Sequence, residues 1–240
     1  MENTRTIILH YHLFKNAGTS IDYILQENFG EQWVTKEFKS LSDNTPEVTQ
    51  WINDYPQAVA FSSHTMIGPV PKIDGVKIIS IVMLRDPIKR IISAYKFERM
   101  QNSDSWGAQM AKQLSFEEYV VTRLKKERDT QCRNFQTERL ATLTEGTETK
   151  IQRAMASLNK ISIFGLVEDF QETLQRIESL IKKDFPDFKC DVTHSNRSRL
   201  FDFEMSPALE QLLDECNRND LRLWNHARKL IKEKNTSSNH

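Results

Sequence analysis

Residues 6–20, TIILHYHLFKNAGTS, contain the stretch that decides the fold. The segment from Thr6 to Phe14 is rich in β-branched and aromatic residues, which is typical of a β-strand. It leads into a turn of small and polar residues, Lys15-Asn16-Ala17-Gly18-Thr19-Ser20. After this turn, apolar residues recur with helical spacing at Ile21, Ile24 and Leu25. The sequence therefore predicts a strand, a tight turn and a helix at the start of the chain.

A second strand-to-helix junction is predicted around Leu84. Residues 77–84 form a nearly continuous apolar run, which fits a strand buried on both faces of a parallel sheet. Asp86 suits a helix N-cap and Pro87 suits the first helical position. One apolar helix face then follows, made by Ile88, Ile91, Ile92 and Tyr95.

The rest of the chain continues this alternation. Residues 58–63 and 162–167 are further strand candidates, and residues 170–181 have the spacing of an amphipathic helix. The Ser115–Glu118 capping box predicts a helix to about Lys126, and two more helices are expected after Ser206 and Asn219. The sequence predicts one α/β domain over residues 1–234, a three-layer sandwich with a mainly parallel sheet, a helical insertion at 100–160 and a disordered tail at 235–240.

Composition narrows the classes of function. The 240 residues include 33 Lys and Arg and 33 Asp and Glu, so the net charge is zero. A general attraction to nucleic acid or to an anionic membrane is therefore not expected, and any anion site must be local. No apolar run approaches the ~20 residues of a membrane span. No signal peptide is evident, so a cytoplasmic location is expected. Three widely spaced cysteines favour buried thiols over disulfides or a zinc cluster.

The turn at residues 15–20 is a candidate anion-binding site. A small-residue turn that opens a helix exposes backbone N–H groups at the positive end of the helix dipole. Thr19 and Ser20 add hydroxyl donors, and Lys15 adds a mobile cation. An ordinary tight turn with an N-cap explains this segment equally well. It is not a Walker A loop, because the lysine precedes the loop and Gly18 is its only glycine.

Arg85 and Ser93 form a second candidate site. Arg85 leaves the carboxyl end of the predicted buried strand, where ligands bind in open α/β sheets. Ser93 lies about two helical turns further on, and the two side chains could close on one phosphate. The alternative is a surface pair of Arg85 with Asp86 and an ordinary helix serine.

The two motifs together resemble a known family. The segments Leu13-Phe14-Lys15-Asn16-Ala17-Gly18-Thr19-Ser20 and Leu84-Arg85-Asp86-Pro87-x-x-Arg90-x-x-Ser93-x-Tyr95 are similar to the two cofactor signatures of sulfotransferases that use 3′-phosphoadenosine 5′-phosphosulfate (PAPS). In that family the first signature holds the 5′-phosphosulfate, and the second holds the 3′-phosphate through its arginine and serine. The Phe164–Phe170 segment, FGLVEDF, resembles a strand-end pattern frequent there. The resemblance spans about residues 7–230 and implies a P-loop-NTPase-like fold and PAPS as co-substrate. No metal is expected, because Lys15 and the turn supply positive charge and no carboxylate pair is placed to hold Mg²⁺.

The details resemble the carbohydrate branch, which includes the uronyl and heparan sulfate 2-O-sulfotransferases. Ser63-His64-Thr65 follows a strand at the place where that branch carries its catalytic histidine. Arg133-Asn134-Phe135-Gln136-Thr137-Glu138-Arg139-Leu140 resembles a segment near the acceptor. The resemblance therefore implies acceptor binding by Arg133, Asn134 and Arg139, and a glycan or small carbohydrate as partner. The chain lacks the membrane anchor and cysteine pairs of the animal members, which suggests a cytosolic, bacterial-type relative.

The chemistry assigns roles to several residues. Sulfuryl transfer is an in-line displacement, so Lys15 would neutralise the bridging oxygen and the N–H groups of Ala17 to Ser20 would hold terminal oxygens. A hydroxyl acceptor must lose a proton, and histidine is the natural base near neutral pH. His64 is the preferred base among the six histidines, because it sits at a strand end beside the expected cofactor edge. His10 and His12 are expected to point into the sheet packing.

Other readings stay open. His194 is the next candidate base, and the basic residues after it, Arg197 and Arg199, would either touch a phosphate or lie in a solvated loop. The basic residues between 125 and 139 would line a groove for an anionic glycan or form a solvated face. The rival functions are a P-loop kinase that uses ATP and Mg²⁺, and a non-catalytic module that binds a nucleotide or a glycan.

Overall fold

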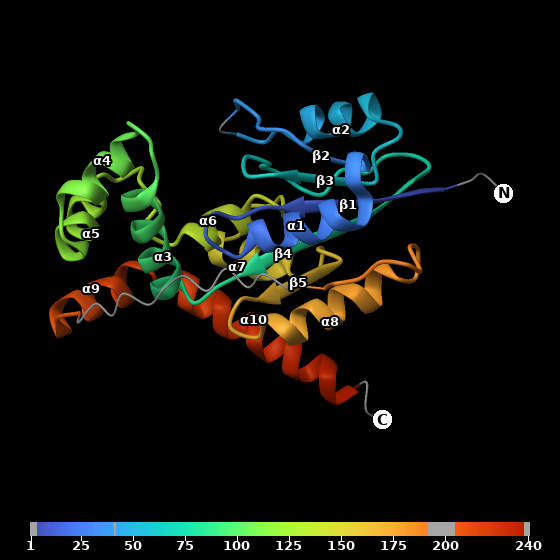
Figure 1. Ribbon diagram of the computed structural model, residues 1–240. Helices are drawn as coiled ribbons and strands as arrows, with labels where there is room; N and C mark the ends of the chain where they lie inside the picture. Colours follow the sequence, from blue (N-terminus) through green and yellow to red (C-terminus); the bar gives the residue numbers. More distant parts are fainter. Residues whose placement is uncertain (1–3, 41, 192–204, 238–240) are drawn as a thin grey trace. The chain divides into compact units, whose positions relative to one another are not determined.

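The computed structural model describes residues 4–40, 42–191 and 205–237 (Figure 1). The chain divides into two compact units. Unit 1 comprises residues 1–84 and 139–196, and unit 2 comprises residues 85–138 and 197–240.

Unit 1 is built on a five-stranded sheet in which every strand pair is parallel. The strand order is β2-β3-β1-β4-β5. The strands are β1 (Arg5–Tyr11), β2 (Trp33–Thr35), β3 (Ala60–Ser63), β4 (Val76–Leu84) and β5 (Ile163–Leu166). The α/β class and the parallel sheet predicted from the sequence are thus confirmed.

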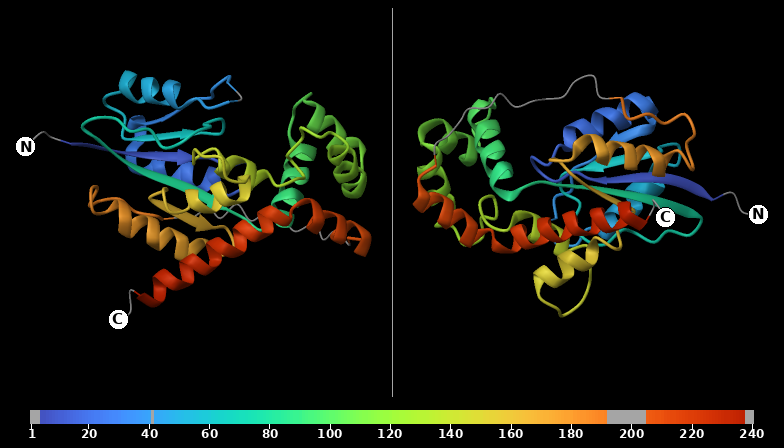
Figure 2. Two further views of the ribbon diagram at one scale, coloured as in Figure 1. Left: turned by 180° about the vertical axis from the view of Figure 1, so that it is seen from behind. Right: turned by 90° about the horizontal axis from the view of Figure 1, so that it is seen from below.

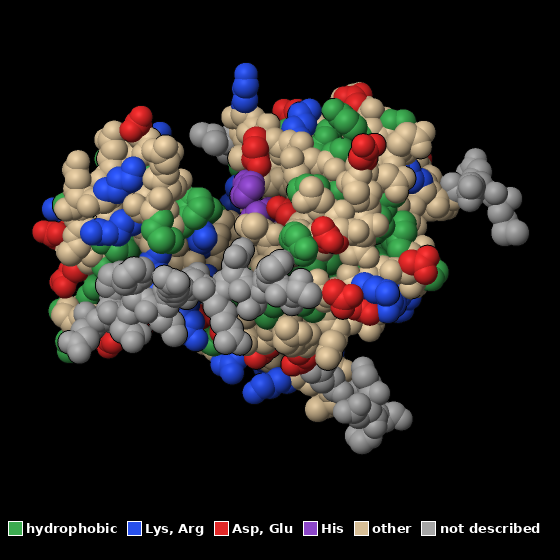
Figure 3. Space-filling view, in the orientation of Figure 1, with side chains coloured by type: hydrophobic (Ala, Val, Ile, Leu, Met, Phe, Trp, Pro, Cys, Tyr) green, Lys and Arg blue, Asp and Glu red, His purple; other side chains and the backbone are tan. Residues whose placement is uncertain are grey.

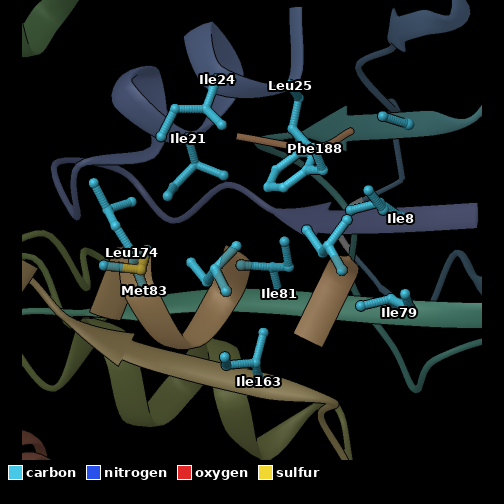
Figure 4. Packing of buried hydrophobic residues seen from close by; sticks show 13 residues of the cluster. Ile8, Ile21, Ile24, Leu25, Ile79, Ile81, Met83, Ile163, Leu174 and Phe188 are labelled. Carbon is cyan, nitrogen blue, oxygen red and sulfur yellow. The ribbon is translucent and has the colours of Figure 1, made fainter. Parts of the chain in front are cut away.

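Two helices cover one face of this sheet. α1 (Gly18–Phe29) and α8 (Phe170–Ile181) pack their apolar sides onto β1, β4 and β5. Figure 4 shows this core, which includes Ile8, Ile21, Leu25, Ile81, Met83, Leu174 and Phe188. The pattern of β-branched strand residues facing apolar helix residues is the reason that these segments fold against each other.

The opposite face carries the third layer. α2 (Thr45–Asp54) places Trp51 against Phe61 of β3, with ring centroids 4.9 Å apart. Phe61 points away from the α1 face, because its neighbour Ala60 belongs to the core beneath α1. Figure 2 shows α7 (Lys150–Ser157) on this same opposite side of the sheet. Unit 1 is therefore the three-layer arrangement expected from the sequence.

Unit 2 is helical in its described part. Its elements are α3 (Pro87–Met100), α4 (Trp106–Gln113), α5 (Phe116–Leu124), α9 (Pro207–Cys216) and α10 (Arg218–Ser237), while α6 (Phe135–Ala141) crosses the boundary to unit 1. The Asp86 side chain accepts from the N–H groups of Ile88 and Lys89, and Ser115 and Glu118 form a capping box. Both predicted helix starts are confirmed, and helices occupy the region of the expected insertion.

Three details differ from the sequence predictions or extend them. The first strand ends at Tyr11 rather than at Phe14, because the chain turns into left-handed conformations at Lys15 and Ala17. β2 and α2 were not predicted, and α10 continues to Ser237.

None of the described helices is long and apolar enough to cross a membrane. Cys132, Cys190 and Cys216 are free, and only Cys132 is fully buried.

Candidate active site at the carboxyl edge of the sheet

The strand order of unit 1 marks one edge of the sheet for ligand binding. After β1 the chain continues to β2 and β3 on one side of β1, and after β4 it continues to β5 on the other side. Ligands of open α/β sheets bind at the point where the strand order reverses in this way, outside the carboxyl ends of the strands. The turn after β1 is fixed at that point, because the buried Asn16 side chain donates from Nδ2 to the carbonyl of Met83 at 2.8 Å.

The turn itself is strained and opens a helix. Lys15 and Ala17 have φ values of 63° and 58°, in a region that costs a residue other than glycine about 1–2 kcal/mol. Ala17 is the N-cap of α1 and offers no side-chain cap. The first N–H groups of an α-helix have no partner within the helix, so this end can bind an anion. The Ser20 N–H is used inside the turn, where it donates to the Ala17 carbonyl.

Gly18 makes room for His12. A Cβ on Gly18 would lie 2.1 Å from Cδ2 and 2.3 Å from Nε2 of the His12 ring. Real Cβ atoms do not approach other atoms so closely. The edge of the His12 imidazole therefore lies directly against Gly18, the first residue of α1.

One carboxylate holds two histidines under α1. His10 and His12 are two residues apart and so face the same side of the sheet, where α1 presents Asp22. Nδ1 of His10 lies 2.8 Å from one Asp22 oxygen, and Nδ1 of His12 lies 2.7 Å from the other. Burial alone would raise the pKa of Asp22, but the hydrogen bonds and positive charge offered by both histidines outweigh it and lower that pKa. Asp22 is thus an anion at neutral pH.

His64 follows β3 and has its own carboxylate. Its Nδ1 lies 2.7 Å from Oε1 of Glu37, which also accepts from the His64 backbone N–H. The Thr65 hydroxyl donates to the other Glu37 oxygen at 2.7 Å. Burial opposes ionisation of Glu37, yet the bonds from Thr65 and His64 lower its pKa. An ionised Glu37 accepts a hydrogen bond from the Nδ1–H group, which leaves Nε2 with the lone pair that a base needs.

The two imidazoles of His12 and His64 are in contact. Their ring centroids are 3.8 Å apart with an interplanar angle of 33°. The backbones explain this proximity, since the His12 N–H donates to the carbonyl of Ser63, the residue before His64. Figure 3 shows histidine side chains reaching the surface beside acidic ones. A continuous series of contacts therefore runs from Glu37 through His64 and His12 to the turn at residues 15–20.

His10, His12 and Asp22 could also hold a metal ion. Their candidate ligand atoms lie within 4.8 Å of one another. The hydrogen bonds already account for the arrangement, because each Nδ1 has its own oxygen of Asp22. The expectation that no metal takes part stays a prediction.

Comparison with known proteins decides the family. The model of the Sulfotransferase family matches residues 3–227 of the chain. The protein belongs to the sulfotransferase family. It is also similar to an uncharacterized protein of Archaeoglobus fulgidus. The two sequences are 35% identical over an aligned length of 249, and the alignment covers 95% of this chain and 98% of the relative. The resemblance noted at the two signatures is confirmed at the level of the family, and the carbohydrate branch is a narrower assignment that neither comparison reaches.

The second sulfotransferase signature lies in unit 2 from Arg85 onward. The backbone of Arg85 is paired with the side-chain amide of Gln136, which accepts from the Arg85 N–H at 2.9 Å and donates to its carbonyl at 2.8 Å. Ser93 is buried in α3. Arg90 is buried as well, and its guanidinium lies 4.6 Å from the centre of the Phe135 ring. Gln136 thus holds the backbone of Arg85 through both of its polar groups.

The segment assigned to the acceptor makes contacts within the protein. Arg133 donates to the carbonyl of Leu124 at 2.8 Å. Oδ1 of Asn134 accepts from the N–H groups of Asn219 and Asp220 and so caps the start of α10. In unit 1, Arg139 donates to the carbonyls of His64 and Met66 at 2.8 and 2.9 Å. Arg139 therefore supports the loop that carries His64. Acceptor binding by these three residues stays a prediction.

Some expected site residues lie elsewhere or were missed. His194, Arg197 and Arg199 fall outside the described residues. Three residues near this edge, Glu37, Asp22 and His12, were not predicted as site residues from the sequence. The spacing of His10 and His12 was the available signal for two histidines on one face of a strand, and Asp22 lies one helical turn after Gly18. Glu37 had no local signal, because its partner is 27 residues away.

Proposed function

We propose that this sulfotransferase transfers a sulfuryl group from PAPS to a hydroxyl group of a carbohydrate, with His64 as the general base. The single observation that carries the proposal is the series of contacts at the sheet edge. These contacts link His64, which is bonded to Glu37, through the ring of His12 to the turn at the start of α1. A base and an anion site so close together suit the transfer of an anionic group to a hydroxyl.

The proposed step is an in-line displacement at sulfur. The acceptor oxygen forms a new S–O bond while the S–O bond to the bridging oxygen breaks, and 3′-phosphoadenosine 5′-phosphate leaves with the electron pair. The acceptor proton moves to Nε2 of His64, while Glu37 stabilises the imidazolium through Nδ1. Lys15 and the N–H groups at the start of α1 offset the negative charge on the leaving phosphate.

The family signature extends the proposal to the nucleotide. Arg85 and Ser93 hold the 3′-phosphate, because a guanidinium matches phosphate geometry. The turn from Lys15 to Ser20, which includes Asn16 and Thr19, holds the 5′-phosphosulfate. The carbohydrate acceptor rests on the resemblance of Ser63-His64-Thr65 and of the segment 133–140 to the carbohydrate branch.

The test measures release of 3′-phosphoadenosine 5′-phosphate from PAPS with a panel of oligosaccharides, with and without uronic acids. His64→Ala is expected to lower kcat by about 10²–10⁴-fold. Its dissociation constant for 3′-phosphoadenosine 5′-phosphate should stay near that of the wild type. His226→Ala, a histidine of α10, is the matched control and should leave both values unchanged.

Two outcomes would contradict the proposal. A wild type that consumes ATP but not PAPS would show a kinase. A His64→Ala variant with normal turnover would show that another group removes the proton.

A further inference from the structure

His12 occupies an unusual position for a histidine that directly follows a strand. It is only 6% exposed, its Nδ1 lies 2.7 Å from Asp22, and its ring touches both His64 and Gly18. His10 makes nearly the same bond to the same carboxylate and is fully buried. The ring of His10 stacks on that of His12, with ring centroids 5.3 Å apart. Both histidines are therefore bonded to Asp22, but His12 also contacts His64 and Gly18.

We propose that His12, held by Asp22, is a positioning residue for His64 that fixes the plane of the catalytic imidazole. The inference rests on the proposed function of His64 as base. Glu37 anchors His64 at one point, Nδ1, and a single hydrogen bond leaves the ring free to rotate about that point. The face of His12 removes this freedom, so that the two contacts together set the direction of Nε2.

The exposure of His64 makes such support necessary. Its side chain is 51% exposed, so core packing does not hold it on most sides. A misplacement of about 1 Å at a reacting group can cost about 100-fold in rate. The buried ring of His12 provides a fixed surface, and Asp22 sets the rotation of that ring through Nδ1.

Asp22 suits this task because of where α1 places it. Gly18 and Asp22 are four residues apart and lie on the same side of α1. Gly18 accepts the edge of the His12 ring, and Asp22 holds its Nδ1. The lowered pKa of Asp22 keeps the carboxylate ionised, which strengthens the bond.

The experiment compares two variants of His12 with a matched change at His10. His12→Asn keeps a donor for Asp22 but removes the ring, and His12→Phe keeps a ring but removes the donor. His10→Phe also removes one hydrogen bond to Asp22, but it leaves the His12–His64 ring contact in place. Each variant is measured for kcat, for the dissociation constant of 3′-phosphoadenosine 5′-phosphate and for melting temperature. The mobility of the His64 ring is measured by carbon-13 relaxation.

Both His12 variants are expected to lower kcat between about 10- and 100-fold, with nucleotide affinity within about threefold of the wild type. The order parameter of the His64 ring should fall from the rigid range near 0.85 toward about 0.6 in His12→Asn. His10→Phe should leave both the kcat and the ring mobility close to the wild-type values.

Three results would overturn the proposal. His12→Asn could keep a rigid His64 ring and a normal kcat, or His10→Phe could lower both values as much as the His12 variants do. A stoichiometric divalent ion whose removal releases His12 would make His12 a metal ligand instead. If a His12 variant does not fold, Asp22→Asn replaces it, because it retains one acceptor oxygen and most of the volume.

The relaxation measurement separates this inference from the proposed function. If the wild type transfers no sulfuryl group to any acceptor, the proposed function fails. The His64 ring mobility still shows whether His12 positions it.

Discussion

Gly18→Ala tests the packing at the start of α1. A new Cβ would lie 2.1–2.5 Å from three atoms of the His12 ring. The ring would have to move by more than about 1 Å to reach ordinary contact. It cannot do so freely, because its Nδ1 is bonded to Asp22 and its face lies against His64.

The size of the effect follows from these contacts. Loss of the bond between His12 and the Asp22 carboxylate costs about 1.5–3 kcal/mol. The crowding itself adds about 1–3 kcal/mol. Alanine is a better helix former than glycine, which offsets up to about 1 kcal/mol. The net loss of unfolding free energy is therefore about 1.5–6 kcal/mol, which lowers the melting temperature by roughly 3–24 °C for a chain of this length.

The assay is thermal unfolding followed by optical spectroscopy, together with kcat under the proposed reaction. Gly75→Ala is the control, because Gly75 has a φ of +70° and nothing within 4 Å of an added Cβ. It should cost only the backbone strain of about 1–2 kcal/mol and leave kcat unchanged. A Gly18→Ala variant that melts at or above the wild-type temperature would refute the reasoning, since His12 would then not be held in place.

Three further predictions concern the ligand, metal and acid. Arg85→Ala should weaken 3′-phosphoadenosine 5′-phosphate by about 1.5–3 kcal/mol in calorimetry but affect AMP little; equal losses would remove the 3′-phosphate assignment. Activity should persist in excess chelator, and a strict Mg²⁺ requirement would favour a kinase. Because the pKa values of Asp22 and Glu37 are lowered on folding, their stabilisation is present above about pH 4 and is lost as the pH falls further. In denaturant titrations, Asp22→Asn should reduce the loss of unfolding free energy as the pH falls below about 4. An unchanged dependence of the unfolding free energy on pH would contradict this prediction.

Local signals predicted much of the fold. The β-branched run before Lys15, the Asp86-Pro87 start of α3 and the capping box at Ser115 each depend on residues a few positions apart. Such features are encoded in short windows of sequence, so they can be recognised without knowing the tertiary structure. The alternation of these elements then predicts the parallel sheet.

Long-range contacts explain what was missed. β2 has only three residues and becomes a strand by pairing with β3, where Trp33 lies opposite Ala60. Pairing of this kind leaves little trace in a short window, because strand preference depends on the neighbouring strand. The prediction of His64 as a site residue came from resemblance, whereas its link to Glu37 requires the sheet to be assembled first.

The parallel sheet is what turns scattered residues into a candidate site. The carboxyl ends of β1, β2 and β3 lie at one edge, since these strands pair in parallel as neighbours. The segment after β1 supplies His12 and Lys15, the segment after β2 supplies Glu37, and the segment after β3 supplies His64. Two carboxylates then hold the two rings, Asp22 that of His12 and Glu37 that of His64. Because the two rings are bonded to different carboxylates, the tilted His12–His64 pair has a defined orientation without a bond between the two imidazoles. The proposed mechanism uses Nε2 of His64, the ring nitrogen that Glu37 does not bind.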